Sequence, residues 1–187
     1  MADDFNYQRR NLILNSDIDE TSIKEIIDKI IDINSYDLEQ YIEQGVEYKR
    51  EPINLYITTG GGEVEQGLAL YDCIKQSKTP VYTYALGKCY SMGLPIFLAG
   101  EKRFCYDNTI FMYHQLSAKE PWLTLRQKEN NLKALVENMS QIRKIILKNT
   151  NINIKLLEDW DSKNQDFYIN SKNALDFGIV HKIIGGE

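Results

Sequence analysis

Ser91 is the side chain in this sequence best placed for nucleophilic chemistry. It lies in the glycine-flanked stretch 87–93, where an expected strand gives way to an expected helix. A hydroxyl at the start of a helix is displayed beside free backbone N–H groups, which can stabilise the oxyanion that forms when a serine attacks a carbonyl. A single serine at such a junction is more often a simple helix cap. Ser91 is therefore a candidate nucleophile, with helix capping as the alternative.

Of the two histidines, His114 is better placed for catalysis than His181. His114 directly follows the apolar stretch 110–113, which predicts a strand. Active sites of α/β folds gather at the carboxyl ends of their strands, where this imidazole would project. His181 lies beside the last predicted strand, and we expect it on the surface. His114 is therefore the candidate partner for a nucleophile.

A run of three glycines at 60–62 marks a second junction between strand and helix. Backbone N–H groups at such a junction attract negative charge. It does not match a nucleotide loop: Leu68 and Ala69 follow Gly67 where a Walker A loop needs lysine and serine or threonine, and Glu65 replaces the last glycine of a dinucleotide motif. A plain tight turn is the alternative. The scattered histidines and cysteines form no ligand cluster, so we expect no metal and no cofactor.

Strand and helix patterns alternate along the chain. We expect strands at 11–15, 53–57, 80–85, 110–113 and 179–184. A capping pattern at Ser22 and Glu25 opens a helix with a stripe of isoleucines, and residues 34–51 predict its continuation followed by an exposed excursion. We expect three further helices: one carries Val64 to Ile74, one ends near Gly100, and one runs from Asn170 to Gly178. Because strands and helices alternate across glycine turns, we predict parallel strands in an α/β fold.

The longest helical pattern runs from Thr124 to about Lys148. Thr124 and Gln127 form a second capping-box pattern, and apolar residues then recur at helical spacing. Roughly 25 residues make a rod of about 37 Å, which is long for a domain of this size. We expect part of this helix to project and pack on another subunit. Packing along its own domain is the alternative.

Composition favours one globular domain over residues 1–187. Hydrophobic residues make up 43% of the chain and aromatic ones 11%, which excludes a disordered tail. No apolar run approaches the ~18–20 residues of a membrane span, and the first ten residues lack the apolar segment of a signal peptide. The net charge of −5 argues weakly against a nucleic-acid binder, although solubility alone explains it. The three cysteines (Cys73, Cys89 and Cys105) indicate free thiols in a reducing compartment, so we predict a cytoplasmic protein.

Five short motifs resemble, in order and spacing, those of the Clp protease proteolytic subunit. They are YITTGGG at 56–62, GLALYD at 67–72, SMG at 91–93, MYHQ at 112–115 and ALDFG at 174–178. The family's versions read YINSPGG, GLAIYD, ASMG, MIHQP and A-x-x-YG. The resemblance runs from about Leu12 to Ile184 and identifies the chain as a divergent member. It implies the ClpP/crotonase-like fold of repeated β-β-α units, with a long protruding helix of handle type.

The resemblance implies a Ser-His-Asp triad. Ser91 matches the family's nucleophile, and His114, 23 residues later, matches its general base. Asp166 matches the family's carboxylate when the motifs are aligned without a gap back from Gly178. Under a shifted alignment two other acids match instead, namely Asp161 and Asp159.

The same resemblance implies a serine endopeptidase that hydrolyses unfolded polypeptides inside a chamber. Gly62 and Met92 match the residues whose N–H groups form the family's oxyanion hole. The implied assembly is a homo-oligomer of seven-membered rings, two of which stack through the long helix into a tetradecamer. A hexameric AAA+ ATPase would feed the chamber. The chain has no nucleotide motif, so any ATPase activity would belong to that partner. No nucleic acid or membrane partner is implied.

Several positions depart from the family's pattern. Gly60 and Leu116 replace prolines, while Lys88 and the bulky Tyr90 replace small residues before the nucleophile. The stretch 117–122 lacks the usual glycines, the segment 35–50 is longer than its counterpart, and few residues precede the first strand. We therefore expect an altered pocket, altered ring pairing and curtailed contacts with an ATPase.

Two other functions stay open. A catalytically modified or inactive ring subunit, or an adaptor, would keep the fold without its activity. A crotonase-like enzyme would use similar glycine-rich N–H groups to hold an acyl-CoA thioester, although Ser91, His114 and Asp166 together argue against it. A membrane-bound relative that degrades signal peptides is disfavoured, because such enzymes use a lysine base.

Overall fold

The computed structural model describes residues 10–116 and 124–185 of the chain. Two stretches expected to depart from the family's pattern lie outside these residues. They are the segment before the first strand, up to residue 9, and the stretch 117–122.

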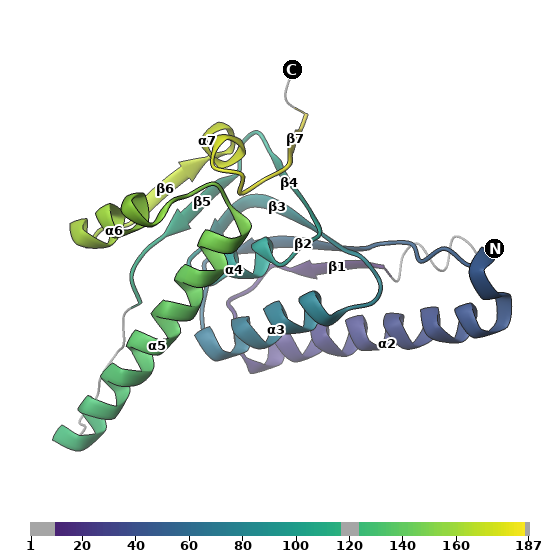
Figure 1. Ribbon diagram of the computed structural model, residues 1–187, viewed down its shortest axis with the longest axis horizontal. Coiled ribbons are helices and arrows are strands. Elements are labelled where there is room, and N and C mark those ends of the chain that lie inside the picture. The colour runs from purple at the N-terminus through teal and green to yellow at the C-terminus, as the bar shows by residue number, and fades with distance from the viewer. Residues whose placement is uncertain (1–9, 117–123, 186–187) are drawn as a thin grey trace.

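One seven-stranded sheet forms the centre of the molecule (Figure 1). The strands are β1 (Asn11–Leu14), β2 (Ile53–Thr59), β3 (Val81–Tyr90), β4 (Lys102–Tyr106), β5 (Ile110–Tyr113), β6 (Phe167–Asn170) and β7 (Lys182–Ile184). They follow the order β1-β2-β3-β4-β7, with every neighbouring pair parallel. The parallel α/β arrangement is therefore as predicted from the alternation of strands and helices.

The long strand β3 has two different neighbours along one edge. Residues 82–85 pair with β4, whereas residues 88–90 pair with β5. Strand β5 in turn pairs with β6, and this pair is antiparallel. Since β3 and β5 run in parallel, their carboxyl ends meet at the same edge, with Tyr90 opposite Met112. Ser91 and His114 each follow one of these two strand ends, so the register places them at the same edge of the sheet.

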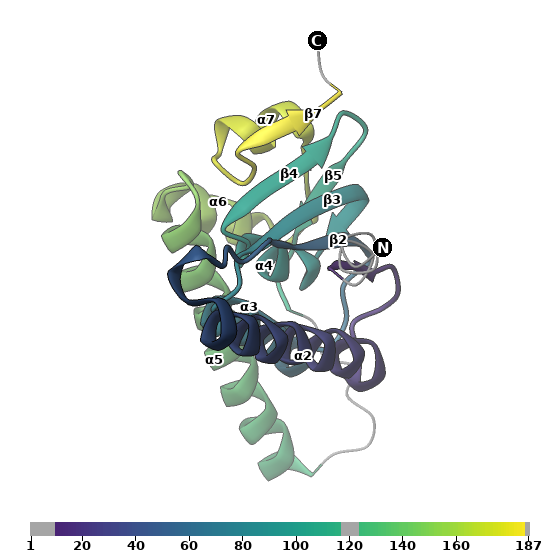
Figure 2. The same cartoon turned by 90° about the vertical axis from the view of Figure 1, so that its right-hand side faces the viewer.

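Helices cover one face of the sheet (Figures 1 and 2). They are α2 (Glu20–Gln44), the 3-10 turn η1 (Gly45–Glu47), α3 (Val64–Gln76), α4 (Gly93–Leu98), α5 (Leu125–Asn149), α6 (Ile154–Lys163) and α7 (Ser171–Asp176). In β2, every second residue points into the core, and Ile53, Leu55 and Ile57 are fully buried. Alternation of this kind is typical of a strand with one face against helices.

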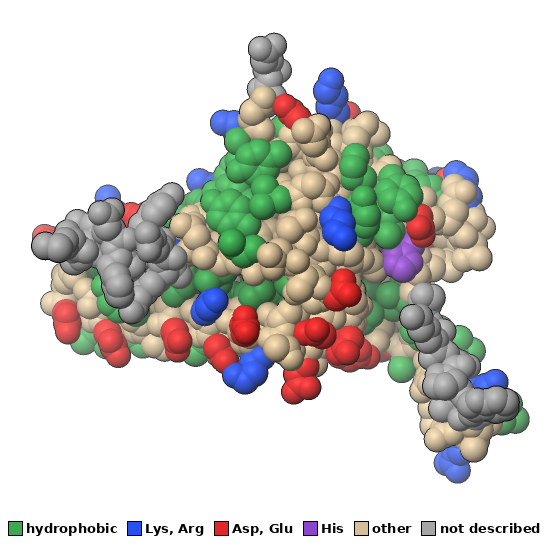
Figure 3. Space-filling model, turned by 180° about the vertical axis from the view of Figure 1, so that it is seen from behind, with side chains coloured by type: hydrophobic (Ala, Val, Ile, Leu, Met, Phe, Trp, Pro, Cys, Tyr) green, Lys and Arg blue, Asp and Glu red, His purple; other side chains and the backbone are tan. Residues whose placement is uncertain are grey.

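The opposite face of the sheet carries a row of aromatic rings. Tyr84 stacks on Tyr56 on one side and on Phe104 on the other, each with ring centroids 4.8 Å apart. Figure 3, which views the molecule from behind, shows hydrophobic side chains gathered on this face and acidic side chains along its lower edge. The uncovered face is thus partly apolar.

The long helix α5 begins at the capping box that the sequence predicts. The Thr124 side chain accepts a hydrogen bond from the N–H of Gln127, whose side chain accepts one from the N–H of Thr124. The first half of α5 leaves the body of the molecule (Figure 1). Three large apolar side chains on this half are 62–76% exposed, namely Leu125, Leu132 and Val136. Packing along its own domain therefore leaves this half of the helix uncovered.

The first long helix begins earlier than its capping pattern predicts. Asp19, not Ser22, is the N-cap: its carboxylate accepts from the Ser22 N–H at 2.8 Å, and the Ser22 hydroxyl accepts from the Asp19 N–H at 3.1 Å. A carboxylate also suits the positive end of the helix dipole. The helix then continues to Gln44, because Asp37 inside it finds buried polar partners. The predicted continuation of the helix past residue 34 is therefore confirmed as far as Gln44, and η1 follows it.

Other boundaries were also wrong. Strand β3 continues to Tyr90 instead of ending at Ala85, because β5 offers its last residues a second neighbour. The closing strand spans only Lys182–Ile184. Strand β4, helix α6 and strand β6 have no counterpart among the predicted elements.

Candidate active site

Ser91 occupies the turn between β3 and α4 in a strained conformation. Its φ of +52° is left-handed, which costs a residue with a Cβ atom free energy and often marks a functional position. Its N–H donates to the carbonyl of Met112 at 2.9 Å, which fixes the turn against β5. The N-cap of α4 is Met92, so the capping alternative for Ser91 is wrong. The strained turn instead leaves the hydroxyl to another partner.

That partner is His114. The Ser91 Oγ lies 2.7 Å from Nε2 of His114, a hydrogen-bonding distance at which the imidazole can accept the hydroxyl proton. In the neutral ring the hydrogen then sits on Nδ1. The structure therefore brings together the two residues predicted as nucleophile and base.

The glycine loop lies directly against this pair. A Cβ atom on Gly61 would stand 2.7 Å from the Ser91 Cβ, and one on Gly62 would stand 2.2 Å from the carbonyl oxygen of Ile18. Both residues also have a positive φ, of +104° and +150°. Only glycine meets these conditions, because it has no Cβ. The loop can therefore approach the nucleophile more closely than other residues would allow.

Two N–H groups near Ser91 have no acceptor among the residues that the structure describes. Gly62 forms a parallel bridge with Ile18, in which Ile18 donates to Gly61 and Glu63 donates to Ile18. In such a bridge the N–H of the central residue points away from the partner strand. Within residues 10–116 and 124–185, neither Gly62 nor Met92 donates its N–H to another residue. Both remain able to bind an anion.

Asp166 lies at the same end of the β5–β6 ladder as His114. The last pair of this antiparallel ladder is Tyr113 with Phe167, so His114 and Asp166 each lie one residue beyond it. In this conformation, however, the exposed Asp166 carboxylate accepts a long hydrogen bond of 3.4 Å from the Tyr168 hydroxyl. The hydrogen bonds of the described residues include none between Asp166 and His114.

The two other candidate acids are bound elsewhere. Asp161 is buried, accepts a hydrogen bond from the Tyr113 hydroxyl at 2.7 Å and pairs with Arg143. Asp159 lies on the surface and pairs with Lys163 one turn along α6. Neither carboxylate contacts His114, so the geometry favours Asp166 over both.

The family model for Clp protease matches residues 4–187 of this sequence. The chain belongs to the Clp protease family. The ATP-dependent Clp protease proteolytic subunit 2 of Treponema pallidum is 31% identical over 138 residues, covering 72% of this chain and 67% of that protein. The proteolytic subunit of Deinococcus radiodurans is 33% identical over 141 residues, covering 72% and 65%. That of Carsonella ruddii is 25% identical over 181 residues, covering 95% and 84%.

Among solved structures, a mutant of ClpP1 from Listeria monocytogenes matches this fold with a TM-score of 0.80. The sequences are 25% identical, and the match covers 100% of this chain and 98% of the other. The predicted Clp family, the α/β ClpP-like fold and the class of serine peptidase are confirmed by these comparisons. The roles of individual residues stay predictions.

One departure from the Clp family pattern alters the surroundings of the pair. Tyr90, the bulky residue before Ser91, packs edge to face against Tyr168 with ring centroids 5.8 Å apart. The Tyr90 ring therefore lies against Tyr168, which comes two residues after the candidate acid Asp166. No sequence signal pointed to this contact, because Tyr168 is distant in the chain.

A second departure, Leu116, lines a cavity of about 540 Å³ beside the His114 segment. Gln115 and the middle part of α5 form the rest of the wall, including Leu132, Val136 and Met139. The cavity is mainly apolar and opens next to the candidate base. In this Clp family member, side chains of α5 thus border the site.

The neighbouring cysteine does not compete with Ser91 as a nucleophile. Cys89 is fully buried, and burial raises the pKa of its thiol, so the reactive thiolate is disfavoured. In the part of the chain that the structure describes, no group of three His, Cys, Asp or Glu residues is arranged to hold a metal ion. No helix within residues 10–116 and 124–185 is long and apolar enough to cross a membrane.

Proposed function

We propose that this protein is a serine endopeptidase that cuts unfolded polypeptides inside an oligomeric chamber. The observation that carries the proposal is the 2.7 Å contact between the Ser91 hydroxyl and Nε2 of His114, in a chain of the Clp protease family. A serine hydroxyl becomes an effective nucleophile when a neighbouring imidazole takes its proton. The family assignment favours peptide hydrolysis over the acyl-CoA alternative.

The reaction would follow the acyl-enzyme route. Ser91 Oγ attacks the peptide carbonyl carbon while its proton passes to Nε2 of His114, and the carbonyl oxygen becomes an oxyanion. His114 then returns the proton to the leaving amine, and the C–N bond breaks. Water hydrolyses the resulting ester by the same proton transfers in the same site. No metal or cofactor takes part in this scheme.

Gly62 and Met92 would supply the oxyanion hole. Their N–H groups lack acceptors within the described chain, and the glycine loop packs against Ser91. A preorganised donor of this kind lowers the activation free energy by about 3 kcal/mol in other serine proteases. The developing negative charge would therefore be stabilised as it forms.

Asp166 would complete the triad by accepting the Nδ1–H of His114. Both residues lie one position beyond the last pair of the β5–β6 ladder, at the same end, and the present bond from the exposed Tyr168 is long. A rotation of the Asp166 side chain would exchange one partner for the other. Once bound, the carboxylate would hold the imidazole in its required tautomer and stabilise the imidazolium.

The assembly and partners follow from the family. We infer a homo-oligomer of seven-membered rings, two of them stacked into a tetradecamer, with the projecting half of α5 between subunits. The relatives are named as subunits of ATP-dependent proteases, and this sequence has no nucleotide motif of its own. An AAA+ ATPase partner would therefore supply the unfolded substrates, in the cytoplasm.

Replacing the nucleophile tests this function. Ser91→Ala should abolish labelling by a fluorophosphonate probe and lower peptide hydrolysis by about 10⁴-fold or more, because it removes the hydroxyl that lies 2.7 Å from Nε2 of His114. Ser162→Ala is the matched control, since that exposed hydroxyl donates only to the carbonyl of Asp159. Full hydrolysis by Ser91→Ala would overturn the assignment.

The second candidate is an inactive ring subunit. The orientation of Asp166 toward Tyr168 favours it, because a triad without its carboxylate is weakened. The same probe decides between the two functions. Rapid labelling of Ser91 in the unmodified protein requires an activated serine and would exclude the inactive subunit.

A further inference from the structure

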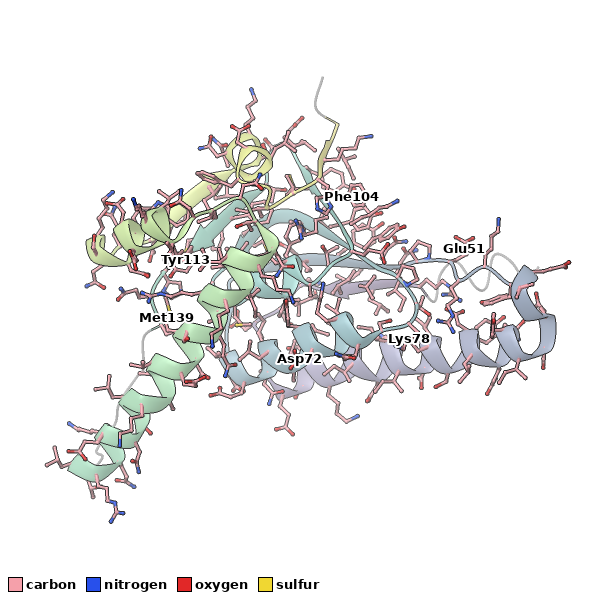
Figure 4. The ribbon with its side chains drawn as sticks, in the orientation of Figure 1. Glu51, Asp72, Lys78, Phe104, Tyr113 and Met139 are labelled. Atoms are coloured by element: carbon pink, nitrogen blue, oxygen red, sulfur yellow. The ribbon has the colours of Figure 1, made fainter. Side chains whose placement is uncertain are left out.

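A cluster of polar side chains around the buried residues Tyr113 and Asp161, which the reaction described above does not use, lies next to His114. We name it the Asp161 cluster, and its members are Asp161, Tyr113, Gln115 and Arg143. Tyr113 ends β5, Asp161 comes from α6, and Arg143 comes from α5. Figure 4 shows Tyr113 where β5 passes between α6 and the body half of α5. The cluster thus joins three elements that are far apart in the sequence.

Asp161 holds both neighbours of His114. The Tyr113 hydroxyl donates to Oδ1 of Asp161 at 2.7 Å, and Nε2 of Gln115 donates to the backbone carbonyl of Asp161 at 2.8 Å. His114 itself is the first residue beyond β5, where the ladder with β6 has ended. The contacts on either side therefore restrain a segment that no strand pairing holds.

Arg143 compensates the buried negative charge of the Asp161 carboxylate. It forms an ion pair with Oδ2 of Asp161, whose side chain is only 7% exposed. A buried carboxylate without a partner is strongly destabilising, and the ion pair with Arg143 offsets the cost of burying Asp161. Both carboxylate oxygens are then occupied. Because both oxygens already have partners, Asp161 is not the triad acid in this proposal.

The ring of Tyr113 is held by packing, and its hydroxyl is held by the hydrogen bond to Asp161. Tyr113 is 3% exposed, and its ring centroid lies 5.9 Å from that of Trp160, the neighbour of Asp161. Burial, together with the bond to Asp161, raises the pKa of Tyr113, so the hydroxyl keeps its proton and acts as a donor. The residue directly before His114 therefore has a single well-defined position.

We propose that Asp161 is a positioning residue, which acts through Tyr113 and Gln115 to hold His114 within reach of Ser91. This inference rests on the proposed function, because it takes His114 as the base. The free energy of proton transfer depends steeply on the distance and alignment of donor and acceptor. A loose His114 segment would therefore lower the rate of acylation without changing where the substrate binds.

The central test removes one hydroxyl. Tyr113→Phe keeps the ring and its packing against Trp160 but deletes the donor to Asp161. We expect kcat and the rate of fluorophosphonate labelling to fall about tenfold, with KM within about twofold of the unmodified protein, because only the catalytic step is affected. Asp161→Asn should lower kcat at least as much, and the double variant should be no slower than Asp161→Asn alone.

The matched control is Asp159→Asn, on the same helix, where the lost ion pair with Lys163 is exposed. It should leave kcat and labelling unchanged. Thermal unfolding of each variant identifies any that fails to fold. Because Tyr113→Phe removes no charge and leaves no cavity beyond one oxygen atom, it keeps the proposal testable if Asp161→Asn does not fold.

Hydrogen exchange of the peptide that spans residues 110–116 provides a readout that needs no activity. Tyr113→Phe should speed the exchange of this peptide, and Asp159→Asn should not. Unchanged kcat in folded Tyr113→Phe, a change confined to KM, or unchanged exchange would each overturn the positioning role. If the unmodified protein does not label at Ser91, the proposed function fails. In that case faster exchange in Tyr113→Phe would still support the restraint of the segment.

Discussion

Asp166 and Asp161 both lie near the segment that carries His114, but different groups bind their carboxylates. Both oxygens of Asp161 are held in the interior by Tyr113 and Arg143. Asp166 is exposed and keeps one long hydrogen bond from Tyr168, which costs little to break in water. The weakly bound acid can turn toward an imidazole, whereas the buried one cannot leave its partners without a large loss of free energy.

At this scale we predict that Asp166→Asn lowers kcat by about 10³–10⁴-fold, because an amide cannot stabilise the imidazolium and can favour the wrong tautomer. Steady-state hydrolysis of a fluorogenic peptide measures the effect. Tyr168→Phe is the comparison: it removes the competing hydroxyl and should leave kcat equal or raised. An unchanged kcat in Asp166→Asn would exclude this residue from the triad.

Helix α2 is anchored to the sheet by a buried carboxylate. Asp37 is fully buried and accepts hydrogen bonds from Arg10 before β1, Thr79 before β3 and Tyr48 after η1. Burial alone would raise the pKa of Asp37, but the three donors outweigh it and lower the pKa below its ordinary value of 3.8. The same carboxylate and burial raise the pKa of Tyr48 to about 12.

This anchor predicts how stability depends on pH. Because the pKa of Asp37 is lower in the folded state, its stabilisation is complete above pH 3.8 and is lost as pH falls through the folded value. Asp37→Asn should lower the free energy of unfolding by about 3 kcal/mol at pH 7 and reduce its fall below pH 4. Chemical denaturation at a series of pH values measures both. Asp32→Asn, on the exposed side of the same helix, should match the unmodified protein.

Local patterns predicted some elements and missed others for a physical reason. Strands β2 and β5 are apolar enough to be evident from sequence alone. In β4, by contrast, the buried residue Arg103 interrupts the apolar alternation, and its guanidinium is satisfied by the carbonyls of Asn149, Gly178 and Ile179. Asp161 is likewise a buried charged residue, and it interrupts the apolar pattern of α6. A buried charged residue interrupts the local apolar pattern of its element. Its burial can be predicted only when the partners that are distant in the chain are known.

The same difference between local and distant contacts applies to the candidate site. Ser91, His114 and the glycine loop follow strand ends and carry motifs, so sequence alone found them. The Asp161 cluster depends on contacts between residues far apart in the chain, and it was missed as a support for His114. A tyrosine at the end of an apolar strand, where the Clp family has an aliphatic residue, was the one signal that could have pointed to it.

On the scale of the whole molecule, the projecting half of α5 is the feature that calls for a partner. Leu125, Leu132 and Val136 are 62–76% exposed on a helix that leaves the body (Figure 1). Apolar side chains gathered on one projecting element are typical of an interaction surface. A second subunit of the proposed ring assembly would bury them.

We therefore predict that Leu132→Glu weakens self-association at least tenfold, because it places a charge in the apolar contact. Sedimentation velocity at several concentrations would show the shift toward smaller species. Lys133→Glu, the adjacent exposed position, also adds negative charge and should leave the distribution nearly unchanged. Identical distributions for Leu132→Glu and the unmodified protein would mean that this half of α5 makes no contact between subunits.

The antiparallel pairing of β6 with β5 also has a consequence during synthesis. Translation delivers Ser91 and His114 well before it delivers α6 and β6, which bring Asp161 and Asp166. A ribosome-bound chain that has emerged only as far as α5 has the candidate nucleophile and base but neither acid. Under the proposed function, the triad can be completed only after β6 has emerged and folded back onto β5. The antiparallel return of β6 therefore sets an order in which the proposed site is assembled, with the acid last.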